Sequence, residues 1–335
     1  LFTVFMYFLQ CYLNGEKRWK NAGLVLTVTM LLFASYYFLY MIAFFAVFYI
    51  LIYSIMQRYS LKRTVGKVAG LGGMGILGVL IGGVALVPIA DTFLESARAG
   101  VLAAKGTSHL LSPYKGKTLG TIVARFFSNH MLGIDKDYTG YLNYYEGMIL
   151  AVSILTVFAV SYFIVKKSTR VKALVLTVFL VFLTIMPLTS RILVFTKHSY
   201  RWTFMICFVE ALVIGCFLQD VFREKNRKTV LTGSILAIVI CGGLLAWMYS
   251  FKNIKPDHKV TAGVIGFLAV YLILFAVGTS VKKMYRIFPA AVLLVLICEL
   301  FVLDYPSLWH RESPTRNQVA TEYYNDGTKE AVAVL

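Results

Sequence analysis

The sequence predicts an all-α polytopic membrane protein. Apolar residues make up 59% of its 335 residues and charged residues only 15%, against about 45–50% and about 25% in soluble domains. Several stretches of 17 or more residues lack any charged side chain, which is typical of helices that cross a bilayer. The net charge of +17 is spread over many loops, and no Walker, H-E-x-x-H, G-x-S-x-G or nucleic-acid motif occurs. No nucleic acid partner is therefore expected.

Ten apolar runs follow one another, and each predicts one span of a transmembrane bundle over residues 1–305. Residues 306–335 are expected to begin an extracytoplasmic region, and the chain is expected to be a piece of a longer protein. The five cysteines lie in apolar runs and indicate buried small side chains. The runs are 1–13, 22–38, 40–56, 68–90, 147–165, 173–190, 202–221, 230–250, 260–280 and 287–303.

Basic residues divide the linkers into two classes. Five short linkers, 40 residues in all, hold 18 of the 33 Lys and Arg, whereas four other segments spread 15 over 112 residues. The positive-inside rule assigns the first class to the cytoplasm and the second to the outside. The cytoplasmic class is 14–21, 57–67, 166–172, 222–229 and 281–286, and the outer class is 91–145, 188–201, 251–260 and 303–335.

Residues 22–56 form one apolar run of 35 residues between two basic linkers. A single helix of that length would be about 52 Å long, more than the roughly 30 Å hydrocarbon core. We therefore expect a hairpin of two short helices with "SYYFLY" at its outer tip. Tyr36, Tyr37 and Tyr40 would either anchor the interface, as tyrosines commonly do, or face a substrate.

A glycine-rich helix precedes the longest outer segment. "GLGGMG" matches a dinucleotide fingerprint by letter but lacks the strand that such a site needs. The spacing of Gly66 with Gly70, and of Gly78 with Gly82, predicts close helix packing instead.

The outer segments hold the candidate polar residues. Asp91 and Glu146 lie at helix ends, where capping or a catalytic carboxylate both fit. A basic amphipathic stretch with Lys115, Lys117, Arg125 and His130 is expected to meet lipid headgroups or phosphate. In 189–202, the residues Arg191, Lys197, His198 and Arg201 form a cationic group that suits either lipid headgroups or a phosphate ligand. Glu210 and Glu299 are ionisable groups within spans, which predicts a functional or a paired structural role.

Five stretches in order resemble bacterial YfhO-like membrane proteins: "SYYFLYM", "ALVPIADTFLESAR", "NYYEGMILAVSIL", "HSYRWTFMICFVEALVIG" and "YYNDGTKEAV". The resemblance covers nearly the whole chain. It implies a GT-C-like transmembrane helix bundle that transfers a sugar from a polyprenyl-phosphate donor to an anionic envelope polymer such as lipoteichoic acid. The reaction would occur at the outer face of the bacterial cytoplasmic membrane.

The same resemblance implies that Tyr36, Tyr37, Tyr40, Tyr145 and Arg201 lie near the substrate cavity. Arg191 and His198 join them as substrate-binding candidates from the cationic loop. The base of such enzymes usually lies in the first outer loop, which would be upstream of Leu1, so Asp91 and Glu146 are secondary candidates. No metal-ligand motif occurs, although this chemistry allows a divalent metal, and membrane lipids are expected partners. A transporter or flippase of lipid-linked saccharides and a non-catalytic scaffold are the alternatives.

Overall fold

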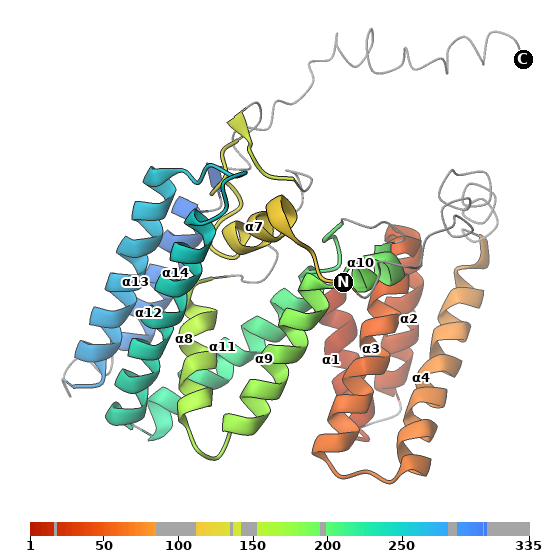
Figure 1. The fold of residues 1–335 in the computed structure, drawn as a ribbon. Helices are drawn as coiled ribbons and strands as arrows, with labels where there is room; N and C mark the ends of the chain where they lie inside the picture. Colours follow the sequence, from red (N-terminus) through yellow and green to blue (C-terminus); the bar gives the residue numbers. More distant parts are fainter. Residues whose placement is uncertain are drawn as a thin grey trace, which may run out of the picture.

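The structure is a computed structural model that describes residues 1–16, 19–84, 112–134, 137–141, 153–194, 199–224, 226–280, 287–303 and 305–306. Over these residues the regular structure consists of twelve helices, without a strand. The all-α prediction is therefore confirmed. Figure 1 shows that most helices run roughly along one direction, with their ends gathered at two opposite sides.

The first group of helices contains α1 (Phe2–Leu13), α2 (Trp19–Ala34), α3 (Tyr36–Met56) and α4 (Leu61–Ile81). Helix α2 packs against α1, α3 and α4, and leucine, valine and phenylalanine side chains fill the space between them. A Cβ at Gly78 would lie 2.8 Å from the carbonyl oxygen of Val25. Gly70, Gly78 and Gly82 thus face neighbouring helices, whereas Gly66 faces open space, so the predicted glycine packing holds for three of the four positions.

The second group is built around α12 (Arg227–Tyr249), which packs against α8 (Leu155–Val165) and α13 (His258–Gly278). Helix α14 (Phe288–Leu303) packs on α13, and α11 (Phe204–Glu224) and α9 (Arg170–Ile185) pack on α8. Two short helices, α7 (Gly116–Arg125) and α10 (Pro187–Val194), lie across the ends of the long ones (Figure 1).

Each of the ten apolar runs contributes a helix, but these helices differ in length. Within the described residues, α3, α4, α11, α12 and α13 are long and apolar enough to cross a membrane, and α9 with α10 forms a sixth candidate span bent by 73°. Helices α1, α2, α8 and α14 have 10–17 residues, and 16 residues extend only about 24 Å. Five or six helices of the described residues thus meet the length expected of a span. Parts of the runs 68–90 and 147–165 lie outside the described residues, so the total of ten spans stays a prediction. Helix α3 is a full-length member of the hairpin whose helices were both expected to be short.

The two linker classes lie at opposite ends of the molecule. The linkers 57–60 and 166–169 both lie at the lower end in Figure 1, which we call the basic end. At the upper end, the main-chain N–H of Asp257 donates to the carbonyl of Met131 at 2.8 Å, and that of Lys255 donates to Thr139 Oγ1 at 3.1 Å. This end, which also carries Ser35 and α10, is called the outer end; the grouping agrees with the charge pattern.

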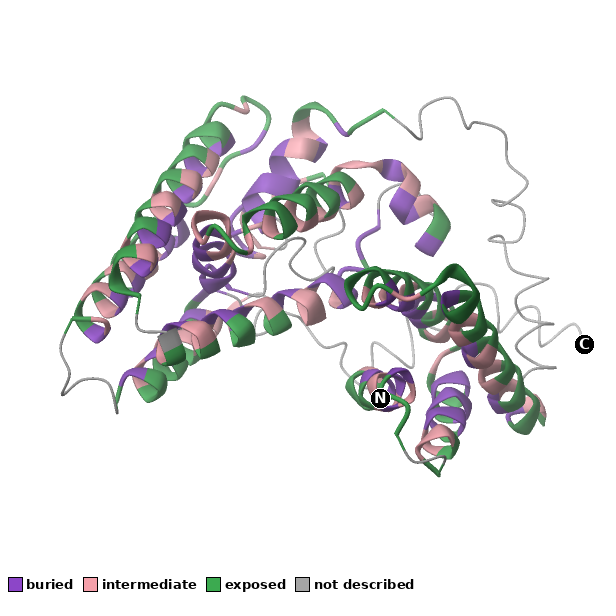
Figure 2. Cartoon of the chain, turned by 90° about the horizontal axis from the view of Figure 1, so that it is seen from below, coloured by how far each residue is buried: buried purple, intermediate pink, exposed green. Residues whose placement is uncertain are grey.

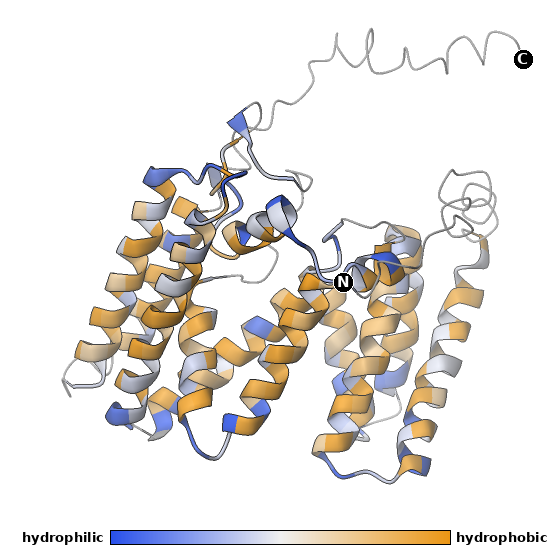
Figure 3. Ribbon diagram, viewed as in Figure 1, coloured by the Kyte–Doolittle hydropathy of each residue, from blue (hydrophilic) through white to orange (hydrophobic). Residues whose placement is uncertain are grey.

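Apolar side chains cover the outward faces of the helices, as expected for contact with lipid. Figure 2 shows exposed residues along these faces, and Figure 3 shows that the helices are hydrophobic along most of their length. Leu80 on α4 is 70% exposed and Val178 on α9 is 67% exposed. Soluble monomers rarely expose apolar surface this extensively, so the fold is built for a bilayer.

One expectation about the outer segment is wrong. Arg125 and His130 do not project toward lipid headgroups, because they are 1% and 8% exposed. The guanidinium of Arg125 lies 5.5 Å from the ring centroid of Tyr138, and His130 Nδ1 lies 3.1 Å from Ser128 Oγ. Helix α7, which ends at Arg125, packs against α12, so this segment lies against the helix bundle. Lys115, by contrast, is exposed.

Candidate functional site

A break at Ser35 separates α2 from α3 and places three tyrosines at the outer end. The main chain at Ser35 is extended, with φ −175° and ψ 111°, and its side chain accepts a hydrogen bond from the N–H of Phe38 at 3.5 Å. Serine is a preferred residue at this capping position because its hydroxyl satisfies an N–H that the first helical turn leaves open. Tyr36, Tyr37 and Tyr40 consequently occupy the first turns of α3.

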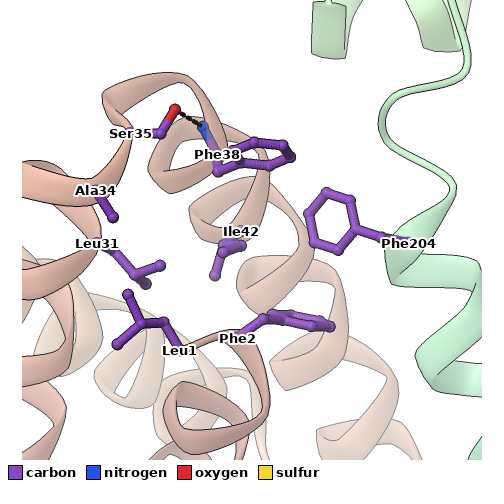
Figure 4. A pocket seen from close by; sticks show the side chains of 8 residues that line it. All are labelled: Leu1, Phe2, Leu31, Ala34, Ser35, Phe38, Ile42 and Phe204. Atoms are coloured by element: carbon purple, nitrogen blue, oxygen red, sulfur yellow. Dashed lines mark hydrogen bonds between the residues drawn. The ribbon is translucent and has the colours of Figure 1, made fainter. Parts of the chain in front are cut away.

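An apolar cavity of about 300 Å³ lies directly beneath this break. Figure 4 shows its lining side chains, which come from α1, α2, α3 and α11 and from Leu1 just before α1. Ser35 is the single polar lining residue, so the cavity suits a hydrocarbon chain. The lining residues are Leu1, Phe2, Leu31, Ala34, Ser35, Phe38, Ile42 and Phe204.

The tyrosine-bearing turn contacts the cationic outer loop. The hydroxyl of Tyr40 donates to the carbonyl of Ile192 on α10 at 3.0 Å. The next side chain, Met41, is fully buried in one apolar cluster with Tyr200 and Trp202. Two stretches far apart in the sequence, "SYYFLYM" and the "SYRW" part of the second motif, therefore meet at the outer end. Arg191, half-buried, precedes Ile192 directly.

The bend between α9 and α10 shapes this loop. Met186 interrupts the span just before Pro187, which has no N–H to continue a helical ladder. Two of the carbonyls freed at the bend accept hydrogen bonds: Tyr114 N–H donates to Ile185 at 3.0 Å and Tyr200 OH donates to Thr184 at 2.9 Å. Such compensation is what allows non-helical main chain near a membrane.

Arg201 is held at the surface between two buried rings. Tyr200 and Trp202 are 1% and 2% exposed and stack with their centroids 6.2 Å apart. The indole N–H of Trp202 donates to Ser190 Oγ at 3.3 Å, which fixes it to α10. Arg201, in the same turn, is exposed. The aromatic residues on either side thus orient the arginine toward the outer surface.

Five of the nine sequence-predicted site residues can be placed. Tyr36, Tyr37, Tyr40, Arg191 and Arg201 lie on α3, on α10 or in the turn before α11, all at the outer end. The other four, Asp91, Tyr145, Glu146 and His198, lie outside the described residues. Within the described part of the chain, no group of three His, Cys, Asp or Glu side chains could hold a metal ion.

Glu299 belongs to a separate buried network. Its carboxylate accepts hydrogen bonds from Ser153 Oγ at 2.6 Å, from the N–H of Ile154 at 2.6 Å and from Tyr271 OH at 2.7 Å. The side chain is 1% exposed. A carboxylate is favoured here because Ile154 immediately precedes α8, at the positive end of the helix dipole. Glu299 thus joins α8, α13 and α14, which explains its place within a span.

Sequence reasoning missed the residues that line the cavity. Phe38 lies within the quoted "SYYFLYM" and Phe204 lies two residues after "HSYRW", but neither has a polar group to attract notice. Their positions beside the two motifs were the available signal.

A family model described as "Bacterial membrane protein YfhO" matches residues 7–333. The chain belongs to the YfhO family. It is therefore a bacterial multi-pass membrane protein. No curated protein and no solved structure matches the chain. Within this family member, the cavity and the Tyr40–Ile192 contact lie where two of the five quoted stretches come together.

Proposed function

We propose that this YfhO family member is a GT-C-like glycosyltransferase of the bacterial cytoplasmic membrane. It transfers a sugar from a polyprenyl-phosphate donor to an anionic cell-envelope polymer, such as lipoteichoic acid, at the extracytoplasmic face. The observation that carries the proposal is the apolar cavity beneath Ser35, beside the tyrosines of α3 and at the same end as Arg191 and Arg201.

The cavity supports binding of an isoprenoid chain, because its lining is apolar apart from Ser35 and it lies at the end opposite the basic linkers. The arginines supply the charge that the donor phosphate requires, and a guanidinium can hold two phosphate oxygens at once. Arg191 and Arg201 therefore bind the phosphate, and Tyr36, Tyr37 and Tyr40 provide rings and hydroxyls for the sugar.

In the transfer step, a hydroxyl of the polymer attacks the anomeric carbon of the sugar, and the bond from that carbon to the phosphate oxygen breaks. The leaving polyprenyl phosphate gains negative charge, which the arginines stabilise. A carboxylate takes the proton of the attacking hydroxyl. Asp91 and Glu146 are the candidates within the chain, with Tyr145 and His198 as further substrate contacts. Metal dependence of this step is tested by assaying with and without a chelator.

The test is an assay of the purified full chain with a polyprenyl-phosphate sugar and an acceptor polymer. We expect the wild-type protein to form glycosylated product and Arg201→Ala to lose roughly 10²-fold in rate, since removing one preorganised charge contact has that scale. Lys252→Ala is the matched control, because Lys252 is another exposed cation at the outer end. Equal rates for Arg201→Ala and wild type would show that Arg201 does not contribute to sugar transfer.

A second function, transport of a lipid-linked saccharide, is favoured by the bent α9–α10 pair. Transporters bind substrates at interrupted helices, usually in matched pairs from two repeats. Within the described residues there is one such pair. Movement of the donor lipid across vesicles without product would support transport. A protein that gives neither product nor movement would instead fit a scaffold in wall synthesis.

A further inference from the structure

A second cavity lies closer to the basic end, between α1, α3 and α11. Its volume is about 460 Å³, larger than the cavity beneath Ser35. Met6, Ile52 and Leu212 give it an apolar wall. Leu212 is 47% exposed and Ile52 is 44% exposed, so the groove opens on the lipid-facing surface of the helices.

A cluster of rings connects the two cavities. Phe2 lines the first cavity, Phe208 lines the second, and their ring centroids are 5.2 Å apart. Phe2 also contacts Phe45 and Phe204 edge-on, at 5.8 Å and 5.2 Å. The two spaces consequently lie side by side but have different lining residues, so each can be considered as a separate binding site.

Polar side chains gather where the groove approaches the basic end. Tyr49 OH donates to Gln10 Oε1 at 2.8 Å, and Tyr53 OH donates to Asn14 Oδ1 at 3.0 Å. Gln10 Nε2 donates to the same Asn14 oxygen at 3.0 Å. The groove is therefore apolar along one part and offers hydroxyl and amide groups at one end, the polarity pattern of a lipid.

Cations contact tyrosines at this end of the groove. The guanidinium of Arg63 lies 3.8 Å from the ring centroid of Tyr59, and that ring lies 6.0 Å from Tyr53, which lines the groove. The Nζ of Lys20 lies 3.4 Å from the hydroxyl of Tyr7, another lining residue, but Lys20 is paired with Glu16, so Arg63 supplies the net charge. Basic pockets between spans on the cytoplasmic side attract anionic lipid headgroups.

We propose that this groove binds an anionic phospholipid of the cytoplasmic leaflet. One acyl chain lies between α1, α3 and α11, and the phosphate lies at the Gln10 and Tyr53 end, near Arg63. The proposal is independent of sugar transfer, because the groove and the cavity beneath Ser35 have no lining residue in common.

The test uses the full chain in phosphatidylcholine nanodiscs that contain a trace of chain-labelled phosphatidylglycerol or chain-labelled phosphatidylcholine. Electron spin resonance measures the fraction of label that the protein immobilises. We expect phosphatidylglycerol to associate roughly fivefold more than phosphatidylcholine, as one surface cation implies, and Arg63→Gln to bring this preference close to one. Equal association of both lipids with the wild-type protein would overturn the proposal.

Filling the groove tests the acyl-chain part. Leu212→Trp should reduce the immobilised phosphatidylglycerol, and Ile52→Trp serves as a second filling variant if the first does not fold. Leu294→Trp is the control, because Leu294 is 62% exposed on α14, away from the groove. If the filling variants fold and still immobilise phosphatidylglycerol as the wild type does, the acyl chain does not bind in this groove. Displacement of the lipid by inorganic phosphate would also overturn it, since the site would then bind a free anion.

Discussion

The phenolic hydroxyl of Tyr40 donates a 3.0 Å hydrogen bond to the main-chain carbonyl of Ile192. This bond ties the first turns of α3 to α10, two elements 152 residues apart. It is a direct polar link between the tyrosine-bearing turn and α10, the helix that carries Arg191. The candidate site is thus assembled from two parts of the chain whose relative position depends in part on one hydroxyl group.

Tyr40→Phe should loosen α10 while leaving the rest of the bundle intact. Loss of an exposed hydrogen bond is expected to cost about 0.5–1 kcal/mol, because water replaces the donor. Hydrogen–deuterium exchange should therefore increase in 187–194 and stay unchanged in α13, which serves as the internal control. Unaltered exchange over 187–194 would mean that apolar packing alone holds α10 in place.

Ala34→Phe should discriminate between donors of different chain length. Ala34 lines the cavity beneath Ser35, and a phenyl group there would occupy the space that we propose for the isoprenoid chain. We expect KM for a long polyprenyl donor to rise several-fold, and KM for a short-chain donor to change little. The control is Ala290→Phe, which adds the same ring to an exposed position of α14. An equal change in KM for both donors would show that the cavity does not bind the polyprenyl chain.

Glu299→Ala should destabilise the second helix group strongly. The change leaves a serine hydroxyl, a tyrosine hydroxyl and the N–H of Ile154 buried without their acceptor. Because buried donors are left unsatisfied and bonds to a carboxylate are lost, we expect the free energy of unfolding to fall by roughly 2–4 kcal/mol. Thermal unfolding in detergent measures the effect, and Tyr271→Phe, which removes one donor, should cost less. A stable Glu299→Ala protein would argue against a structural role for this carboxylate.

Gly78→Ala should destabilise the packing of α2 against α4. The added Cβ would meet Val25 O and Val28 Cβ, each at 2.8 Å, and overpacking of this kind costs roughly 1–3 kcal/mol. Gly72→Ala is the matched control, since a Cβ at Gly72 on the same helix meets nothing within 4 Å. Unfolding in detergent should separate the two variants. Identical stability of the two variants would show that α2 and α4 can move apart at little cost to make room for the added methyl group.

Periodicity and charge predict much of this fold. The 35-residue run had to turn because basic linkers flank it on both sides, and Ser35 is a residue type that commonly begins a helix. The length of each helix was harder to predict, since hydropathy does not mark where a helix stops inside an apolar run. The run 173–190 was expected to be one span, but the helix bends before Pro187. The groups that donate to the carbonyls at this bend belong to Tyr114 and Tyr200, which lie outside α9 and α10.

Pairings across the bundle explain the remaining misses. Glu299 was recognisable as a carboxylate within a span, but its donors lie on other segments, more than 25 residues away. Arg125 had the spacing of an amphipathic surface helix, yet α12 covers it. In both cases contacts between helices decide which face of a helix is buried. The periodicity of one helix does not reveal which other segments will cover it.

The buried rings on either side of Arg201 have a consequence for affinity. Because Tyr200 and Trp202 are buried and hold the main chain of this turn, the phosphate that we propose at Arg201 would not need to order the turn on binding. The entropy lost on binding is then confined to the side chain, which favours tighter association than a free loop would give. Replacing Tyr200 or Trp202 by a small side chain should therefore weaken binding of the proposed phosphate, even though Arg191 and Arg201 are still present.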